Sequence, residues 1–218
     1  MTTGLSPGAW EKVAFIDAPF CDGCGSPYEF ETGLRCAPCQ TRPRAFDRAR
    51  AACLYDESSR DLVLQFKHAD RTDLSPLFAA WISRAASDVL GEADAVAPVP
   101  LHGSRLFRRK YNQAAEIARL VAKKAGRAYL PDALVRKRDT GSQAGRSGSG
   151  RRRNVAADFA VPPGRRGQVA GKRVLLIDDV MTTGATAEAC ARALRSAGAV
   201  GVDVAVIARV KEAASLPI

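Results

Sequence analysis

Residues 174–186 read VLLIDDVMTTGAT and change character three times. The first four residues are aliphatic, and such a run bounded by charge predicts a strand that is buried on both faces, as in a parallel sheet. Asp178 and Asp179 stand where we expect this strand to end. A loop of small and hydroxyl residues follows, and the apolar residues beyond it recur at helical spacing until Gly198. The stretch therefore predicts a strand, a loop and a helix, the repeating unit of an α/β fold.

The two aspartates and the loop after them suit a sugar phosphate. Ligands of open α/β sheets bind at the carboxyl edge of the strands, so carboxylates there would face a crevice. Backbone N–H groups of small residues can approach an anion closely, and the N-terminal dipole of the next helix favours a phosphate. We therefore expect ribose hydroxyls on Asp178 and Asp179 and a phosphate in residues 182–186, the phosphate loop. The other candidate residues of this site are Val180, Met181, Thr182, Thr183, Gly184, Ala185 and Thr186.

Two other interpretations of this stretch are open. The aspartates could simply cap and solvate the end of a strand. The stretch could also be the acidic strand of a P-loop ATPase, but such a protein needs a G-x-x-x-x-G-K-[ST] motif elsewhere, and the sequence contains none. Residues 167–172 have the wrong spacing and precede the strand instead of following one. We therefore favour the sugar-phosphate site.

Length and composition allow one α/β domain with a small appendage. The chain has 218 residues, of which 46% are hydrophobic, enough for a substantial core. The N-terminal residues do not have the pattern of a signal peptide, and no run of about 18 uncharged apolar residues is present, so we expect no membrane span and a cytoplasmic location. Six cysteines in that reducing compartment indicate metal ligands or buried thiols and not disulfides.

Four of the cysteines form two C-x-x-C pairs: Cys21, Cys24, Cys36 and Cys39. Two such knuckles can bring four thiolates into a tetrahedron, so the spacing predicts one structural Zn²⁺. A redox C-x-x-C pair is the alternative, and the absence of a preceding strand and helix pattern argues against it. The metal would fold a segment that has few apolar residues. We therefore divide the chain into a zinc-binding module with a linker, residues 1–50, and a main domain, residues 51–218.

Hydrophobic periodicity predicts further elements in the main domain. Strands are expected at residues 51–55, 93–99 and 202–210. Helices are expected at residues 60–66, 74–90 and 112–126, with Lys67 and His68 in the loop after the first helix. Short strands are also expected on either side of a Gly, Ser and Arg-rich run, residues 141–153, which makes this run a hairpin-like, mobile excursion.

Positive charge is concentrated in one part of the chain. The net charge is +10, but the segment between Arg105 and Arg173 holds 19 Lys and Arg residues against four acids. Such a segment concentrates positive potential where a polyanion would sit, although a solvated basic face is the other explanation. If the polyanion is a nucleic acid, the candidate contacts are Arg108, Arg109, Lys110, Arg151, Arg152 and Arg153.

The chain resembles the ComF family, which is associated with natural competence, in motifs that follow the family order. These are the double cysteine knuckle, Tyr55, the FKH of residues 66–68, the PVPL of residues 98–101, the RKYNQA of residues 109–114, Thr140 with Gln143, the RRNV of residues 152–155, and the DD and TTGAT of residues 178–186. The last motif also resembles the signature with which type I phosphoribosyltransferases bind phosphoribosyl pyrophosphate (PRPP).

The resemblance implies a type I phosphoribosyltransferase fold, with a parallel sheet flanked by helices. It also implies that PRPP binds with Mg²⁺, that the phosphate loop receives the 5′-phosphate, and that residues 137–153 close over the ligand. The pyrophosphate would lie near Lys67, Leu101 and His102, and the implied catalytic residues are Asp178, Asp179 and Arg138.

Two functions are consistent with these features. One is an enzyme that transfers ribose 5-phosphate from PRPP to an acceptor and releases pyrophosphate. The other is a module for single-stranded DNA in DNA uptake, in which the zinc knuckle and the basic segment hold the strand and PRPP is a regulatory ligand. Competence-machinery proteins and further copies of this chain are the other partners that we expect.

Overall fold

The computed structural model describes residues 7–28, 34–68, 71–101, 111–137 and 158–211. Within these ranges a parallel five-stranded sheet has the order β1-β7-β6-β2-β3, and β4 and β5 form a small antiparallel pair. The strands are β1 (Ala49–Leu54), β2 (Ala95–Pro98), β3 (Ala128–Tyr129), β4 (Val135–Arg136), β5 (Phe159–Ala160), β6 (Arg173–Met181) and β7 (Gly201–Arg209). The expected α/β fold class is confirmed.

Helices cover both faces of this sheet. The α-helices are α1 (Pro7–Trp10), α2 (Ala37–Thr41), α3 (Glu57–His68), α4 (Ser75–Ala85), α5 (Ser87–Glu92), α7 (Gln113–Ala125), α9 (Arg166–Val169) and α10 (Ala185–Ser196). Two short 3₁₀ helices are η1 (Thr72–Leu74) and η2 (Pro163–Arg165). No helix in the described ranges is long and apolar enough to cross a bilayer.

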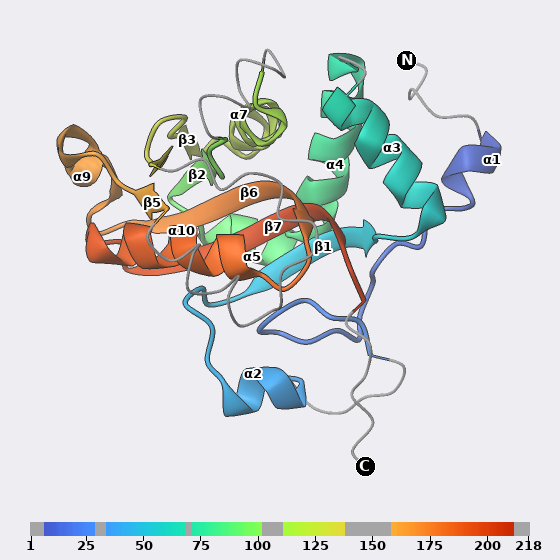
Figure 1. Ribbon diagram of the computed structural model, residues 1–218, viewed down its shortest axis with the longest axis horizontal. Coiled ribbons are helices and arrows are strands. Elements are labelled where there is room, and N and C mark those ends of the chain that lie inside the picture. The colour runs from blue at the N-terminus through green and yellow to red at the C-terminus, as the bar shows by residue number, and fades with distance from the viewer. Residues whose placement is uncertain (1–6, 29–33, 69–70, 102–110, 138–157, 212–218) are drawn as a thin grey trace.

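The central strand β6 shows how the layers form. Its side chains alternate between the faces, so Val174 and Leu176 join the core under α10, whereas Leu175 and Ile177 join the core under α3, α4 and α7. All four residues are fully buried. Figure 1 shows α10 on one side of β6 and β7, and α3, α4 and α7 on the other. The continuous aliphatic run therefore reflects burial on two faces, as expected.

Most of the other expected elements are confirmed. The strands at 51–55, 93–99 and 202–210 correspond to β1, β2 and β7, and β4 and β5 flank the predicted excursion. The helix at 112–126 is α7, which begins after Asn112, whose side chain accepts the N–H of Ala114, and ends at Gly126 in the left-handed conformation. Residues 138–157, including the excursion itself, lie outside the described ranges.

Two expectations about helices were wrong. The helix expected at 74–90 is divided into α4 and α5, because Ala86 leaves the helical conformation (φ −106°, ψ 20°). Neither Pro nor Gly marks this break, and it allows Val89 and Leu90 to pack into the same core as α4. The helix expected at 60–66 is the longer α3, so Lys67 and His68 belong to its last turn instead of a loop.

The N-terminal residues pack along the outer edge of β1. The N–H of Ile16 donates to the carbonyl of Ala52 (3.0 Å), and the N–H of Leu54 donates to the carbonyl of Ala14 (2.8 Å). At the start of the strand, the N–H of Ala49 donates to the carbonyl of Gly23 in the first cysteine knuckle (3.0 Å). The first knuckle and the sheet are thus joined by main-chain hydrogen bonds.

This close contact explains one glycine. Gly25 has φ +68°, and a Cβ atom there would lie 2.6 Å from the carbonyl oxygen of Ala49. Only glycine satisfies both the left-handed conformation and this approach. Two arginines strengthen the same junction: Arg50 donates to the carboxylate and carbonyl of Asp22, and buried Arg209 at the end of β7 donates to the carbonyl of Cys24.

Candidate functional site

Strand β6 carries both aspartates inside the sheet instead of ending at them. We expected it to end at Asp178 and Asp179, but the ladder continues to Met181, because Asp178, Val180 and Met181 all pair with residues of β7. The side chains of adjacent strand residues point to opposite faces. Asp178 accordingly lines a hollow together with the phosphate loop, whereas Asp179 contacts Lys67 of α3. The two carboxylates are neighbours in sequence but have different surroundings.

The phosphate loop surrounds a hollow of about 100 Å³. Its lining residues are Asp178, Val180, Met181, Thr182, Thr183, Gly184, Ala185, Thr186, Ala187 and Val206. Gly184 has φ +77° and is the N-cap residue of α10, and because it has no side chain it cannot cap the first turn of the helix. The first N–H groups of a helix need acceptors, and an anion can supply them. The hollow therefore combines a carboxylate with the positive end of a helix.

Burial and neighbouring charge change the chemistry of Asp178. Burial of the carboxyl group, together with the negative charge of Asp179, raises the pKa of Asp178 to about 7. The N–H of Asp179 donates to Oδ1 of Asp178 (2.8 Å), and the N–H of Val180 donates to Oδ1 of Asp179 (2.6 Å). A carboxyl group that titrates near neutral pH can either accept or donate a hydrogen bond at the ligand.

Lys67 lies at the site although it is distant in sequence. Its Nζ is 2.9 Å from Oδ2 of Asp179, and both side chains are less than one-fifth exposed. The end of α3 that carries Lys67 is held by residues just before and within α7: Gln113 donates to the carbonyl of Lys67 (3.2 Å), and the hydroxyl of Tyr111 donates to the carbonyl of Phe66 (2.8 Å). The structure therefore brings Lys67 to the carboxyl edge of the sheet.

The expected pyrophosphate contacts Leu101 and His102 follow β2 in the sequence. The N–H of Val99 donates to the carbonyl of Ile177 (2.9 Å), and the side chain of Asn112 donates to the carbonyl of Val99 (3.1 Å). Leu101 is half-buried, and it is the last described residue before position 111. The predicted contacts His102, Arg108, Arg109, Lys110, Arg138, Arg151, Arg152 and Arg153 lie outside the described ranges.

Two further candidate residues of the site, Arg44 and Glu188, were not predicted from the sequence. Arg44, from the predicted linker, donates to the carbonyl of Thr183 in the phosphate loop (3.0 Å) and to Oε1 of Glu188 in α10 (2.9 Å). Burial alone would raise the pKa of Glu188, but hydrogen bonds from Arg44 and Arg192 reverse this effect and lower it. Because these contacts join segments far apart in the chain, no local spacing could have predicted them.

The four predicted metal ligands form one cluster. Their sulfur atoms all lie within 4.8 Å of one another, and the Sγ atoms of Cys24 and Cys36 are 3.7 Å apart. Four sulfurs that coordinate one zinc ion at about 2.3 Å lie about 3.8 Å from each other. Backbone N–H groups of Cys24 and Cys36 donate to Sγ of Cys21 (3.4 and 3.2 Å). The donor set and its spacing fit a tetrahedral metal site.

Electrostatics also favour a thiolate in this cluster. The side-chain hydrogen bond from Cys24 and the backbone hydrogen bonds from Cys36 and Cys24 lower the pKa of Cys21 to about 3 despite partial burial. The same side-chain hydrogen bond and burial raise the pKa of Cys24. Since the thiolate is the form that binds a metal, Cys21 is already in the protonation state that a metal ligand needs.

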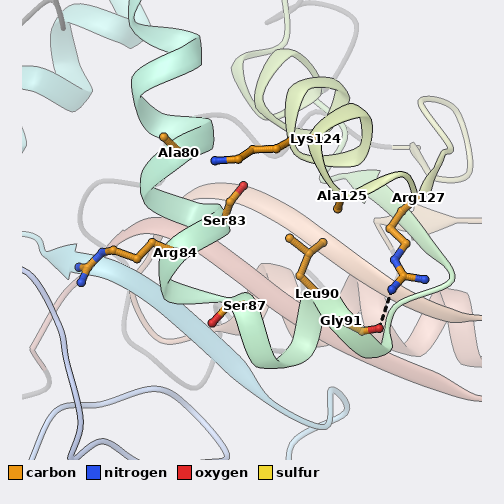
Figure 2. Close-up of a pocket in the computed structure, with 9 residues that line it drawn as sticks. All are labelled: Ala80, Ser83, Arg84, Ser87, Leu90, Gly91, Lys124, Ala125 and Arg127. Atoms are coloured by element: carbon orange, nitrogen blue, oxygen red, sulfur yellow. Dashed lines mark hydrogen bonds between the residues drawn. The ribbon is translucent and has the colours of Figure 1, made fainter.

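A larger hollow of about 390 Å³ lies elsewhere, between α4, α5 and the end of α7. Figure 2 shows Lys124 reaching across it toward α4, while Arg127 donates to the carbonyl of Gly91 (2.6 Å). Helix α7 has 13 residues and is therefore about 20 Å long. Because Lys67 lies near the beginning of α7 and this hollow near its end, the hollow is remote from Asp178 and contains none of the predicted site residues.

Comparison with known proteins agrees with this arrangement. The phosphoribosyl transferase domain family matches residues 75–217. Competence protein F of Haemophilus influenzae is 28% identical over 211 residues, which cover 94% of this chain and 90% of that protein. The DNA utilization protein YhgH of Escherichia coli K12 is also 28% identical, over 92% of this chain and 91% of that protein. The competence protein ComFC of Streptococcus pneumoniae is 26% identical, over 84% of this chain and 84% of that protein.

Among solved structures, the glutamine PRPP amidotransferase from B. subtilis aligns with a TM-score of 0.45 and 24% identity, over 66% of this chain and 30% of that chain. Because the family model matches more than half of the chain, the chain belongs to the phosphoribosyl transferase domain family, and the relatives named above confirm its resemblance to the ComF proteins.

Proposed function

We propose that this chain binds PRPP at the carboxyl edge of β6 and transfers its ribose 5-phosphate to an acceptor in DNA uptake or use. The proposal rests on the hollow that Asp178 and the phosphate loop line together. The carboxylate suits the hydroxyls of a ribose 5-phosphate, and the loop suits its phosphate. The link to DNA rests on the names of the relatives, which are competence and DNA utilization proteins.

The roles of the residues follow from their chemistry. N–H groups at the start of α10 bind the 5′-phosphate. The carboxylates of Asp178 and Asp179 accept hydrogen bonds from the ribose hydroxyls, and their charge stabilises positive charge that develops on the sugar. Lys67, which already faces this edge through Asp179, contacts the pyrophosphate. Mg²⁺ bound with PRPP would neutralise charge on the phosphate oxygens.

In the proposed reaction, the bond between C1′ of the ribose and the pyrophosphate oxygen breaks, and the pyrophosphate leaves with the electron pair. A nucleophile of the acceptor then forms a bond to C1′. No side chain has to become covalently attached, so catalysis rests on positioning the reactants and on stabilising the departing charge.

We also propose that the cysteine cluster binds one Zn²⁺ as a structural ion. All four ligands are sulfur and the sulfur spacing fits a tetrahedron, so no coordination position is open for chemistry. The zinc site then folds the N-terminal module and holds it against β1.

Calorimetric titration with PRPP and Mg²⁺ tests the proposal. In the double variant Asp178→Asn, Asp179→Asn, binding should weaken by about 1–3 kcal/mol for each lost charge-assisted contact. Pyrophosphate release, measured while candidate acceptors are screened, tests the transfer. Equal PRPP binding by the wild type and the double variant would contradict the site assignment. Tight binding without release for any acceptor would restrict the function to binding.

A further inference from the structure

Arg44 lies where the cysteine cluster, the phosphate loop and α10 meet. Its Nη1 donates to the carbonyl of Thr183 (3.0 Å) and to Oε1 of Glu188 (2.9 Å), and its side chain is 15% exposed. Cys39 of the cluster lies close enough to this guanidinium to interact with it electrostatically. Burial alone would lower the pKa of Arg44, but the hydrogen bond to Glu188 opposes burial, and the pKa is raised. Arg44 is therefore a fixed cation.

The contact with Thr183 determines the orientation of one peptide group. A trans peptide is planar, and its C=O and N–H point in opposite directions. Since the C=O of Thr183 points to Arg44, the N–H of Gly184 points away from Arg44. Both Thr183 and Gly184 line the hollow that Asp178 shares. The N–H of Gly184 therefore does not face the guanidinium, and it belongs to a residue that lines the hollow where an anion would bind.

This peptide group would otherwise be easy to rotate. Gly184 has no side chain, and its φ of +77° is a value that glycine exchanges for negative φ at little cost. Rotation of the Thr183–Gly184 peptide would exchange the positions of C=O and N–H and place a carbonyl oxygen toward the anion. The hydrogen bond from Arg44 opposes that rotation.

We propose that Arg44 is a positioning residue for the phosphate loop: by holding the carbonyl of Thr183, it directs the N–H of Gly184 toward the bound phosphate. Arg44 does not touch the ligand. This inference rests on the proposed PRPP site, and it adds a dependence of that site on a residue of the N-terminal module.

A neighbouring arginine provides a matched control. Arg42 contacts the same carboxylate of Glu188, with Nη2 3.6 Å from Oε2, but its side chain is 53% exposed. Among the described residues 34–68, Arg44 is the only arginine that donates to the carbonyl of Thr183. Replacing either arginine removes one positive charge beside Glu188, but only Arg44→Met frees the carbonyl of Thr183.

The test measures PRPP affinity by calorimetry and exchange of the Gly184 amide by NMR in ligand-free protein, for Arg44→Met, Arg44→Lys and Arg42→Met. We expect Arg44→Met to bind PRPP about tenfold more weakly, as for the loss of one charge-assisted hydrogen bond, and Arg42→Met to bind within about twofold of the wild type. Arg44→Lys should recover part of the affinity, because an ammonium group can donate to the same carbonyl. The Gly184 amide signal should shift and broaden only in Arg44→Met.

The outcomes separate the two proposals. If the wild type itself does not bind PRPP, the proposed function fails, while the amide signal still tests whether Arg44 orients the peptide. Equal loss of affinity in Arg44→Met and Arg42→Met, or an unchanged Gly184 amide in Arg44→Met, would overturn the inference. Zinc content is measured for each variant, and if Arg44→Met loses the metal, Arg44→Leu, which also has no donor, replaces it under the same criteria.

Discussion

The ionised carboxylate of Asp178 lowers the stability of the folded protein. Burial and the charge of Asp179 raise its pKa to about 7, whereas a carboxyl group in an unfolded chain titrates near about 3.9. The folded protein therefore holds this proton more tightly than the unfolded chain. Between these two values the folded state loses stability as the pH rises, and the full cost is present above pH 7. Functional sites commonly accept such a cost.

Asp178→Asn should remove this cost. We expect the variant to unfold at a higher urea concentration than the wild type at pH 8, with a gain of about 2 kcal/mol, and the gain should shrink at pH 5. Urea titrations at the two pH values measure the difference. A variant that is less stable than the wild type at both pH values would contradict the pKa assignment, and PRPP binding measured in parallel should be weaker despite the higher stability.

One substitution distinguishes a contact of Lys67 with the pyrophosphate from a role of Lys67 in orienting Asp179. If Lys67 contacts the pyrophosphate, Lys67→Met should weaken PRPP binding about tenfold but leave ribose 5-phosphate binding nearly unchanged. If it only orients Asp179, both ligands should lose affinity equally. Lys172→Met is the control, because Lys172 precedes the opposite end of β6. Calorimetry with the two ligands gives the answer.

At the level of elements, the sequence predicted what local pattern controls. The aliphatic run of β6 and the helical periodicity of residues 112–126 correspond to the observed β6 and α7, because burial of one or two faces imposes a repeating pattern on neighbouring residues. The break at Ala86 left no such mark, because it results from how Val89 and Leu90 pack against distant residues. Strand pairing with β7, which extends β6 past Asp178, is likewise a long-range effect.

The candidate site shows the same division. The spacing of the four cysteines predicted their cluster, and the run of small residues after Asp179 predicted a loop followed by a helix, which is α10. The contact of Lys67 with Asp179 and that of Arg44 with Thr183 depend on tertiary structure. A sequence can suggest such residues only when they belong to a recognised motif, as Lys67 does and Arg44 does not.

The cysteine cluster should determine whether the N-terminal module stays ordered. Cys36→Ser removes one of four ligands, so bound zinc should fall from one ion per chain to nearly none. Hydrogen exchange should then rise at residues 21–28 and 34–41, while β6 and β7 stay protected. Cys36→His, which keeps a zinc ligand, should retain most of the metal. Full zinc content in Cys36→Ser, measured by atomic absorption, would exclude Cys36 as a ligand.

At the scale of the whole molecule, charge separates two kinds of ligand. The chain carries a net charge of +10, so a nucleic-acid backbone would be attracted to its basic segments, whereas PRPP needs the carboxylates of β6. In the double variant Asp178→Asn, Asp179→Asn, we expect weaker PRPP binding but equal or tighter binding of single-stranded DNA, because two negative charges are lost.

Fluorescence anisotropy with a labelled oligonucleotide at several salt concentrations measures the second half of this prediction. A steep decrease in affinity with salt would indicate contacts with the phosphate backbone. Parallel loss of both ligands in a variant that remains folded would show that DNA and PRPP share one pocket.

The main-chain hydrogen bonds along the outer edge of β1 determine how a truncated chain that lacks the N-terminal module would behave. β1 is the last strand of its sheet on that side, and Ile16, Gly23 and Ala14 occupy donors and acceptors that would otherwise face solvent. Unpaired strand edges are templates on which other copies add, which leads to aggregation. A fragment that starts at residue 51, the boundary that we predicted from the cysteine module and its linker, would expose this strand edge. We therefore expect the N-terminal module to prevent self-association, and the fragment should precipitate where the full chain stays dispersed.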